Sequence, residues 1–263
     1  MKERINDFIK QYYSENTRKN YLSILNKFNQ WCGGEIPTEG MWVGEWKKFL
    51  INQGLCAKSV NQGLIVVGRF YEYVTGGKIH FDRLKQTPAK VEFLSTNDLR
   101  LLIGVSDKIM IGVIKFMIDS GVRLSELVEI SNRDIIGEIP KEWVIIGKGS
   151  KQRLVMISND TVSCLENIRV GEKMFGRRLT GRYLQRKLRK LGELAGIRKN
   201  IHPHMLRHTS ATISLWNGAD ITDVQKMLGH SNVATTQIYA HVTDDRLRVV
   251  WNKCFENRGE VGK

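Results

Sequence analysis

Four short segments carry basic, imidazole and phenol side chains that could do chemistry together. They are DSGVRLSELVEI with Arg123, GKGSKQR with Lys148, IHPHMLRHTSAT with His204 and Arg207, and MLGHSNVATTQIYAHV with His230 and Tyr239. Guanidinium groups bind phosphate oxygens through two parallel hydrogen bonds, and imidazoles exchange protons near neutral pH. The basic and imidazole side chains therefore suit the binding of a phosphate group.

The third segment by itself indicates an anion site. Pro203 suits the first position of a helix, which places His204 and Arg207 on one face of its first turn. The N-terminus of a helix presents free N–H groups and positive dipole to an anion. The alternative is a zinc pair formed by His204 and His208, four residues apart. Zinc would need a third ligand, and the segment lacks the nearby carboxylate or Cys that usually supplies one.

The second and fourth segments have rival interpretations. A tyrosine near a helix end, such as Tyr239, is usually a half-buried core residue, so alone it would be interpreted as structural. The GKGSK turn resembles part of a nucleotide-binding P-loop, but Glu142 stands where that pattern needs glycine, and Gly149 follows Lys148. A Walker-type nucleotide triphosphatase is therefore excluded.

Helical patterns in the first third of the chain predict a separate domain. Thr17 could cap a helix that ends at Gly33-Gly34, with Tyr21, Ile24, Leu25, Phe28 and Cys32 on one face. Val60, Leu64, Val67, Tyr71 and Val74 repeat at helical spacing before Gly76-Gly77. The segment FDRLKQTPAKVEFLS is polar and contains Pro88, which is typical of a linker. We therefore expect a helical domain over residues 1–80, a linker over 81–92 and a second domain over 93–263.

The second domain should also be mainly helical. Ser95 with Asp98 resembles a capping box at its first helix. Apolar runs at 143–146 and 154–157, rich in Val and Ile, flank Gly147 and Gly149 and predict a β-hairpin. Everything after residue 160 has helical character.

The charge of the chain predicts a polyanionic partner. Lys and Arg number 41 against 27 Asp and Glu, a net charge of +14 over 263 residues. Both expected domains are basic, which favours a clamp over a single basic tail. Residues 177–199 are the densest basic run, with Glu193 as their one acid, and we expect this run to face phosphates.

Other classes of protein fit the sequence poorly. The longest apolar stretch, IMIGVIKFMI, contains Lys115 and is too short for a membrane span, which needs about 20 residues. The charged N-terminus is unlike a signal peptide. The cysteines at 32, 56, 164 and 254 are far apart, so we expect reduced thiols and a cytoplasmic protein.

Taken together, the four segments resemble the tyrosine recombinase family, which contains phage integrases and Xer recombinases. The resemblance covers about 93–263 well, and the first 92 residues only in size, helix content and general pattern. It assigns a first arginine to Arg123, a hairpin lysine to Lys148, the His-x-x-Arg pair to His204 and Arg207, a second histidine to His230 and the nucleophile to Tyr239. It implies a mainly α fold with a small β-hairpin, comprising a helical core-binding domain and an α+β catalytic domain.

The resemblance also implies the reaction and its partners. Tyr239 would attack the phosphorus to give a 3′-phosphotyrosine, the arginines would stabilise the charge, and Lys148 would protonate the leaving 5′ oxygen. No metal or nucleotide cofactor would be needed. The partners would be double-stranded DNA with specific recombination sites and further copies of the chain, as a tetramer on two duplexes. Two alternatives are a type IB-like DNA topoisomerase and a catalytically silent DNA-binding regulator.

Further expectations concern DNA contacts and self-association. We expect DNA-binding side chains at Lys58, Arg69, Lys151, Arg153, Arg177, Arg178, Arg182 and Arg186. An expected C-terminal helix at about 244–257 has an apolar face that includes Leu247, Trp251 and Phe255. This helix could dock on a neighbouring subunit or on its own domain.

Overall fold

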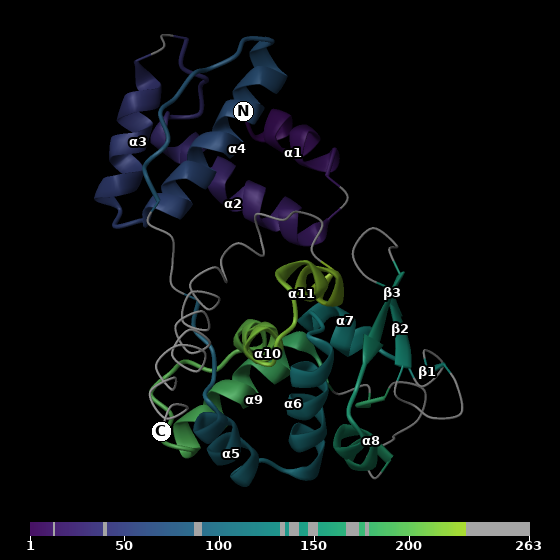
Figure 1. Ribbon diagram of the computed structural model, residues 1–263. Coiled ribbons are helices and arrows are strands. Elements are labelled where there is room, and N and C mark those ends of the chain that lie inside the picture. The colour runs from purple at the N-terminus through teal and green to yellow at the C-terminus, as the bar shows by residue number, and fades with distance from the viewer. Residues whose placement is uncertain are drawn as a thin grey trace, which may run out of the picture. The chain divides into compact units, whose positions relative to one another are not determined.

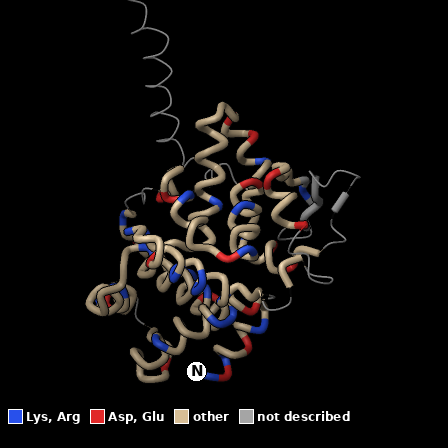
Figure 2. Tube along the Cα trace, turned by 90° about the horizontal axis from the view of Figure 1, so that it is seen from below, with Lys and Arg blue, Asp and Glu red and all other residues tan. Residues whose placement is uncertain are grey.

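A computed structural model describes the chain at residues 1–12, 14–38, 41–86, 91–131, 135–136, 142–146, 152–166, 174–176 and 179–229. The chain forms two compact units, Met1–Pro88 and Ala89–Lys263. Lys and Arg recur along the described helices of both units (blue in Figure 2), as expected for a strongly basic chain. Among the described residues no helix is long and apolar enough to span a membrane.

The first unit is helical in its described part (Figure 1), and its core is rich in aromatic rings. Its helices are α1 (Lys2–Lys10), α2 (Glu15–Trp31), α3 (Trp42–Asn52) and α4 (Ala57–Thr75). Helix α4 packs against the other three. Phe28 and Trp46 pack edge to face at the centre, with ring centroids 5.2 Å apart, and both are buried.

The expected helices of this unit are confirmed, although one begins at a different residue. Helix α2 begins after Ser14, whose side chain accepts a hydrogen bond from the Thr17 N–H, so Thr17 is not the cap that the sequence suggested. Ser14 has the extended backbone of an N-cap residue, whereas Thr17 already lies in the first turn. Helix α4 ends at Gly76 in the left-handed conformation, as its Gly-Gly pair predicted.

The second unit combines helices with one small sheet (Figure 1). Its described elements are α5 (Thr96–Gly104), α6 (Lys108–Ser120), α7 (Leu124–Glu129), β1 (Ile135–Ile136), β2 (Glu142–Ile146), β3 (Gln152–Met156), α8 (Asn159–Glu166), α9 (Gly181–Leu194), α10 (Pro203–Trp216) and α11 (Ile221–Leu228). The sheet is antiparallel in the order β1-β2-β3. The hairpin of β2 and β3 is confirmed, and the two-residue β1 was not predicted.

Helix α6 organises the core of this unit. It packs against α5, α8, α10 and β3, which explains why it is apolar on most sides. Phe116, Met117 and Val113 are fully buried there. Helix α6 ends at Gly121, which has φ +59°. A Cβ at this glycine would lie 2.6 Å from Leu228 Cδ2, so the close approach of α11 also requires glycine.

The segment that the sequence predicted as a linker, residues 81–92, packs at both ends. On the first unit, Leu84 exchanges two hydrogen bonds with the Asn61 side chain. On the second unit, Val91 is buried against α10 and α11. Three residues later the Leu94 N–H donates to Thr209 Oγ1. The ends of this segment therefore belong to the two units themselves.

Two helix boundaries of the second unit follow the predicted local rules. Ser95 and Asp98 form the expected capping box at α5, and Lys199 adds an ion pair to Asp98 at 2.7 Å. Helix α11 ends at Gly229 with φ +63°, the left-handed conformation that favours glycine after a helix. These rules are local, so they could be recognised without knowledge of the tertiary structure.

Candidate functional site

A cavity of about 900 Å³ in the second unit gathers side chains from three helices. The cavity-lining residues that carry charge or an imidazole are Arg123, Arg182, Arg186, Arg189, His202, His204 and Arg207. They come from the start of α7, one face of α9 and the N-terminal turns of α10. Among the residues that the structure describes, no acidic side chain lines the cavity. The cavity therefore suits an extended anion.

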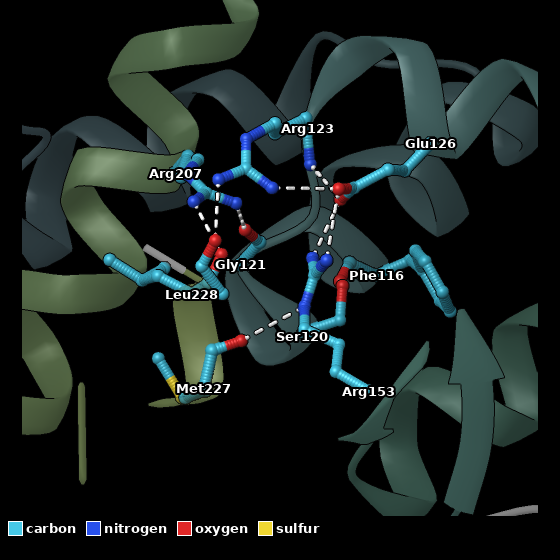
Figure 3. Close-up of polar contacts among 10 residues, drawn as sticks. Phe116, Ser120, Gly121, Arg123, Glu126, Arg153, Arg207, Met227 and Leu228 are labelled. Atoms are coloured by element: carbon cyan, nitrogen blue, oxygen red, sulfur yellow. Dashed lines mark hydrogen bonds and ion pairs between the residues drawn. The ribbon is translucent and has the colours of Figure 1, made fainter. Parts of the chain in front are cut away.

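Arg123 lies at the N-cap of α7 and is held by three hydrogen bonds (Figure 3). Its Nη1 donates to Glu126 Oε1 at 2.9 Å, and its Nη2 donates to the Gly229 carbonyl at 2.8 Å. The backbone N–H of Arg123 donates to Glu126 Oε2 at 2.8 Å. The side chain is 32% exposed, so the guanidinium is fixed in direction while one side faces the cavity.

Arg207 is almost fully buried, with 2% of its surface exposed. Its Nη1 donates to the Gly121 carbonyl at 2.5 Å and its Nη2 to the Leu228 carbonyl at 2.6 Å (Figure 3). The first acceptor ends α6 and the second ends α11, so Arg207 bridges two helix C-termini, where a cation is favoured. The same residue lines the cavity beside Arg123.

His204 lies one turn before Arg207, on the same side of α10, as the sequence predicted. Burial lowers the pKa of His204, and the positive charges of Arg207 and Arg123 lower it further. His204 is therefore neutral at pH 7 and can accept a proton. Its ring stacks on His208 at 5.3 Å between centroids, and burial lowers the pKa of His208 to about 4.

The N-terminus of α10 also faces the cavity. His202 is its N-cap, and the His202 Nδ1 accepts a hydrogen bond from the Met205 N–H at 3.2 Å. Pro203 follows as the first helical residue, as predicted. The helix dipole adds positive potential to that of the arginines. For the zinc alternative, no group of three or more potential ligands occurs within the described ranges.

Behind Arg123 lies a buried ion network that the sequence did not predict (Figure 3). Glu126 accepts hydrogen bonds from Arg123 and, through both carboxylate oxygens, from Arg153 at 2.9 and 2.6 Å. Burial acts to raise the pKa of Glu126, but the hydrogen bonds and charges of the two arginines outweigh burial and bring it to about 2. Glu126 is therefore ionised throughout the physiological range.

The predicted DNA-binding residues fall into different environments. Arg182 and Arg186 line the cavity, together with Arg189, which the sequence analysis did not single out. The spacing of these three arginines along α9 places them on one helical face and could have revealed Arg189. Arg153 was expected to contact DNA, but its side chain is only 11% exposed, and its guanidinium binds Glu126 and Met227 inside the unit.

Two other predicted DNA-binding residues lie in the first unit. Lys58 is exposed in the first turn of α4. Arg69 lies further along the same helix and donates to Tyr21 Oη at 3.0 Å. The remaining predicted residues, Lys148, Lys151, Arg177, Arg178, His230 and Tyr239, lie outside the described residues, as does the expected helix at 244–257.

Comparison with known proteins decides the family. The model described as "Phage integrase family" matches residues 91–246. The chain belongs to this family. Tyrosine recombinase XerC of Psychromonas ingrahamii is 30% identical over 262 residues, covering 89% of this chain and 85% of the relative. Tyrosine recombinase XerD of Staphylococcus aureus strain Mu50 is 30% identical over 237 residues, covering 78% of each protein.

Solved structures agree with this assignment. The crystal structure of XerA recombinase is 26% identical, covers 96% of this chain and 98% of the XerA chain, and superposes with a TM-score of 0.55. XerH recombinase bound to a palindromic difH substrate shares the fold, with a TM-score of 0.73 at 20% identity, covering 90% of this chain and 79% of the XerH chain. The chain is thus a tyrosine-type site-specific DNA recombinase of the phage integrase family. Neither the topoisomerase nor the regulator alternative gains support.

Proposed function

We propose that this recombinase cleaves and rejoins duplex DNA at a phosphodiester bound in the cavity of the second unit, through a covalent bond to Tyr239. The observation that carries the proposal is the common location of Arg123, His204 and Arg207. These residues lie up to 84 positions apart in sequence, yet all three line one cavity, and none of its described lining residues is acidic. The arrangement concentrates fixed positive charge where a phosphate must gain negative charge.

The chemistry can be assigned to residues. The Tyr239 oxygen attacks phosphorus and its proton passes to an imidazole, for which His204, with its lowered pKa, and His230 are the candidates. The bond from phosphorus to the 5′ oxygen breaks, and Lys148 donates a proton to give a free 5′ hydroxyl. Arg123 and Arg207 stabilise the charge on the non-bridging oxygens. A 5′ hydroxyl then attacks the phosphotyrosine and restores a phosphodiester.

A covalent-capture experiment tests this proposal. Nicked duplexes with a randomised central segment are incubated with the protein, and DNA that stays attached to protein in detergent is sequenced. We expect a defined target sequence, an adduct that forms in EDTA, and no adduct from Tyr239→Phe because the nucleophilic oxygen is absent. Failure of the wild-type protein to form an adduct on DNA that it binds specifically would contradict the proposal.

The products of the rejoining step distinguish a recombinase from a topoisomerase. With paired copies of the recovered site, a recombinase gives four-way junctions and exchanged products. An enzyme that forms the adduct but only relaxes supercoiled DNA would be a topoisomerase. Exchange requires two duplexes, so the proposal includes a tetramer in which the expected helix at 244–257 docks on a neighbouring subunit. The proposal also includes the cytoplasmic location that the sequence predicts.

We further propose that α9 follows the DNA backbone next to the cleaved phosphate, through Arg182, Arg186 and Arg189. Each arginine that neutralises a phosphate of duplex DNA contributes about −0.9 to the slope of log K against log salt. Replacing Arg182 or Arg186 by alanine should therefore reduce the steepness of that slope by about 0.9. Binding measured by fluorescence anisotropy across a salt series checks this.

The matched control for the salt series is Arg100→Ala, because Arg100 is an exposed arginine of α5 that does not line the cavity. This variant should keep the wild-type slope. An unchanged slope in Arg182→Ala and Arg186→Ala would show that α9 does not contact phosphates.

A further inference from the structure

Three arginines bind the three successive carbonyls that end α11. Arg153 Nε donates to the Met227 carbonyl at 3.2 Å. Arg207 and Arg123 donate to the next two carbonyls, Leu228 and Gly229, at 2.6 and 2.8 Å. The last carbonyls of a helix have no partner within it, and cations are favoured there. The next residue in the chain is His230, so these contacts fix the place from which the His230 segment departs.

Arg153 differs from the other two arginines because it does not line the cavity. Its guanidinium forms a two-pronged pair with Glu126, and the side chains of Arg153 and Glu126 are only 11% and 4% exposed. Glu126 in turn binds both the backbone N–H and the guanidinium of Arg123. Arg153 can thus influence a bound phosphate only through other residues.

We propose that Arg153 is a positioning residue for DNA cleavage, which aims Arg123 through Glu126 and fixes the end of α11 through the Met227 carbonyl. Arg153 belongs to β3, where its backbone pairs with Ile145 of β2, so the hairpin that carries Lys148 is joined to the same network. One guanidinium therefore connects the hairpin, the start of α7 and the end of α11. The inference rests on the proposed function.

The contacts of Arg153 require the shape of arginine as well as its charge. Three of its nitrogens donate, two toward Glu126 and one toward Met227. A lysine ammonium is a point charge on a flexible stem and cannot reproduce this planar fork. The space beside the side chain is limited too, since a Cβ at Gly229 would lie 3.0 Å from Arg153 Cδ. Arg153→Lys should therefore keep the charge and lose the alignment.

Loss of Arg153 should also change how cleavage depends on pH. Within the described part of the chain, the charged groups that face Glu126 are Arg153 from β3 and Arg123 from the start of α7. Without Arg153, only Arg123 would still lower the pKa of Glu126. Burial, which acts in the opposite direction, would then raise this pKa above its value in the wild-type protein. As pH falls, Glu126 would then become protonated at a higher pH than in the wild-type protein and lose its hold on Arg123. Cleavage by the variant should therefore decline at a higher pH.

The test uses the full-length protein and a nicked duplex that carries the sequence recovered by covalent capture. Single-turnover cleavage, DNA affinity and melting temperature are measured for Arg153→Lys, Arg153→Met and the exposed control Arg100→Met. We expect Arg153→Met to cleave about 10²-fold more slowly at saturating protein, because a small misplacement of a catalytic group has effects of this size. Affinity should change by less than about threefold, since many phosphate contacts remain.

A double variant separates positioning from folding. Arg153→Met combined with Glu126→Gln leaves no unpaired buried carboxylate, so it should recover melting temperature. It should not recover the cleavage rate, because Arg123 stays unaligned. The pH profile of Arg153→Met should show its acid limb at higher pH than the wild-type protein, and the profile of Arg100→Met should coincide with wild type.

The outcomes distinguish this inference from the proposed function. A wild-type adduct with unchanged cleavage by Arg153→Met would overturn the role of Arg153 and leave the proposed function standing. The role would also be overturned if the double variant regained full cleavage, or if affinity and cleavage fell in the same proportion. Absence of an adduct in the wild-type protein would overturn both.

Discussion

Replacing Arg207 by alanine should slow DNA cleavage by at least about 10²-fold, as expected for loss of a preorganised charge that stabilises a transition state. It should also destabilise the second unit. Arg207 is 2% exposed, and its guanidinium supplies donors to the Gly121 and Leu228 carbonyls. Each buried acceptor left without a partner costs about 1–3 kcal/mol. Single-turnover cleavage and urea unfolding measure the two effects.

Arg123→Ala is the matched comparison for Arg207→Ala. Arg123 lines the same cavity, but its side chain is 32% exposed, and the Gly229 carbonyl that it binds is on an exposed residue. We therefore expect a similar loss of cleavage with a smaller loss of stability. For both variants the affinity for DNA should fall much less than the cleavage rate. If affinity and cleavage fell together in correctly folded protein, the assignment of these arginines to the transition state would be wrong.

The sequence predicted well those features of the site that depend on neighbours in the chain. Pro203 starts α10 and so places His204 and Arg207 one turn apart. The rules concerned are local, because helix caps and helix spacing are set by residues within about four positions. The β2–β3 hairpin followed from two short apolar runs and the glycines between them, which are also close together in the chain.

The role of Arg153 could not be predicted in this way. In the sequence it is one basic residue among several in a hairpin, and its type is equally suited to DNA phosphate and to a buried carboxylate. What decides between them is contact with Glu126, 27 positions earlier, and with Met227, 74 positions later. Glu126 itself carried a weak signal, since an acid three residues after a helix start often caps it. Its burial between two arginines depends on the tertiary fold.

The charge of Glu126 should contribute strongly to the stability of the second unit, and Glu126→Gln tests this. Removing one partner of a buried ion pair costs about 3–5 kcal/mol, because the other charges remain buried without compensation. Here Arg153 and Arg123 would both lose their carboxylate. Urea unfolding at pH 7 should show the loss, whereas Glu92→Gln, the same change at an exposed position, should unfold as wild type.

The stability that Glu126 contributes should depend on pH in a direction that follows from its pKa. The pKa of Glu126 is about 2 in the folded chain against 4.5 for an ordinary glutamate. Such a group adds stability that is fully present above pH 4.5 and is lost as pH falls toward 2, by an amount of about 3 kcal/mol. The difference in stability between wild type and Glu126→Gln should therefore shrink steadily as pH is lowered below 4.5.

The titration of His208 does not alter the comparison of stability between wild type and Glu126→Gln. The pKa of His208 is about 4, below its ordinary 6.5, so its protonation also destabilises the fold as pH falls below 6.5. That loss is common to the wild type and to Glu126→Gln and cancels in their difference. If the difference in the free energy of unfolding between wild type and Glu126→Gln stayed constant from pH 7 to pH 3, the shape of the Glu126 side chain would stabilise the unit. Its charge would then contribute nothing.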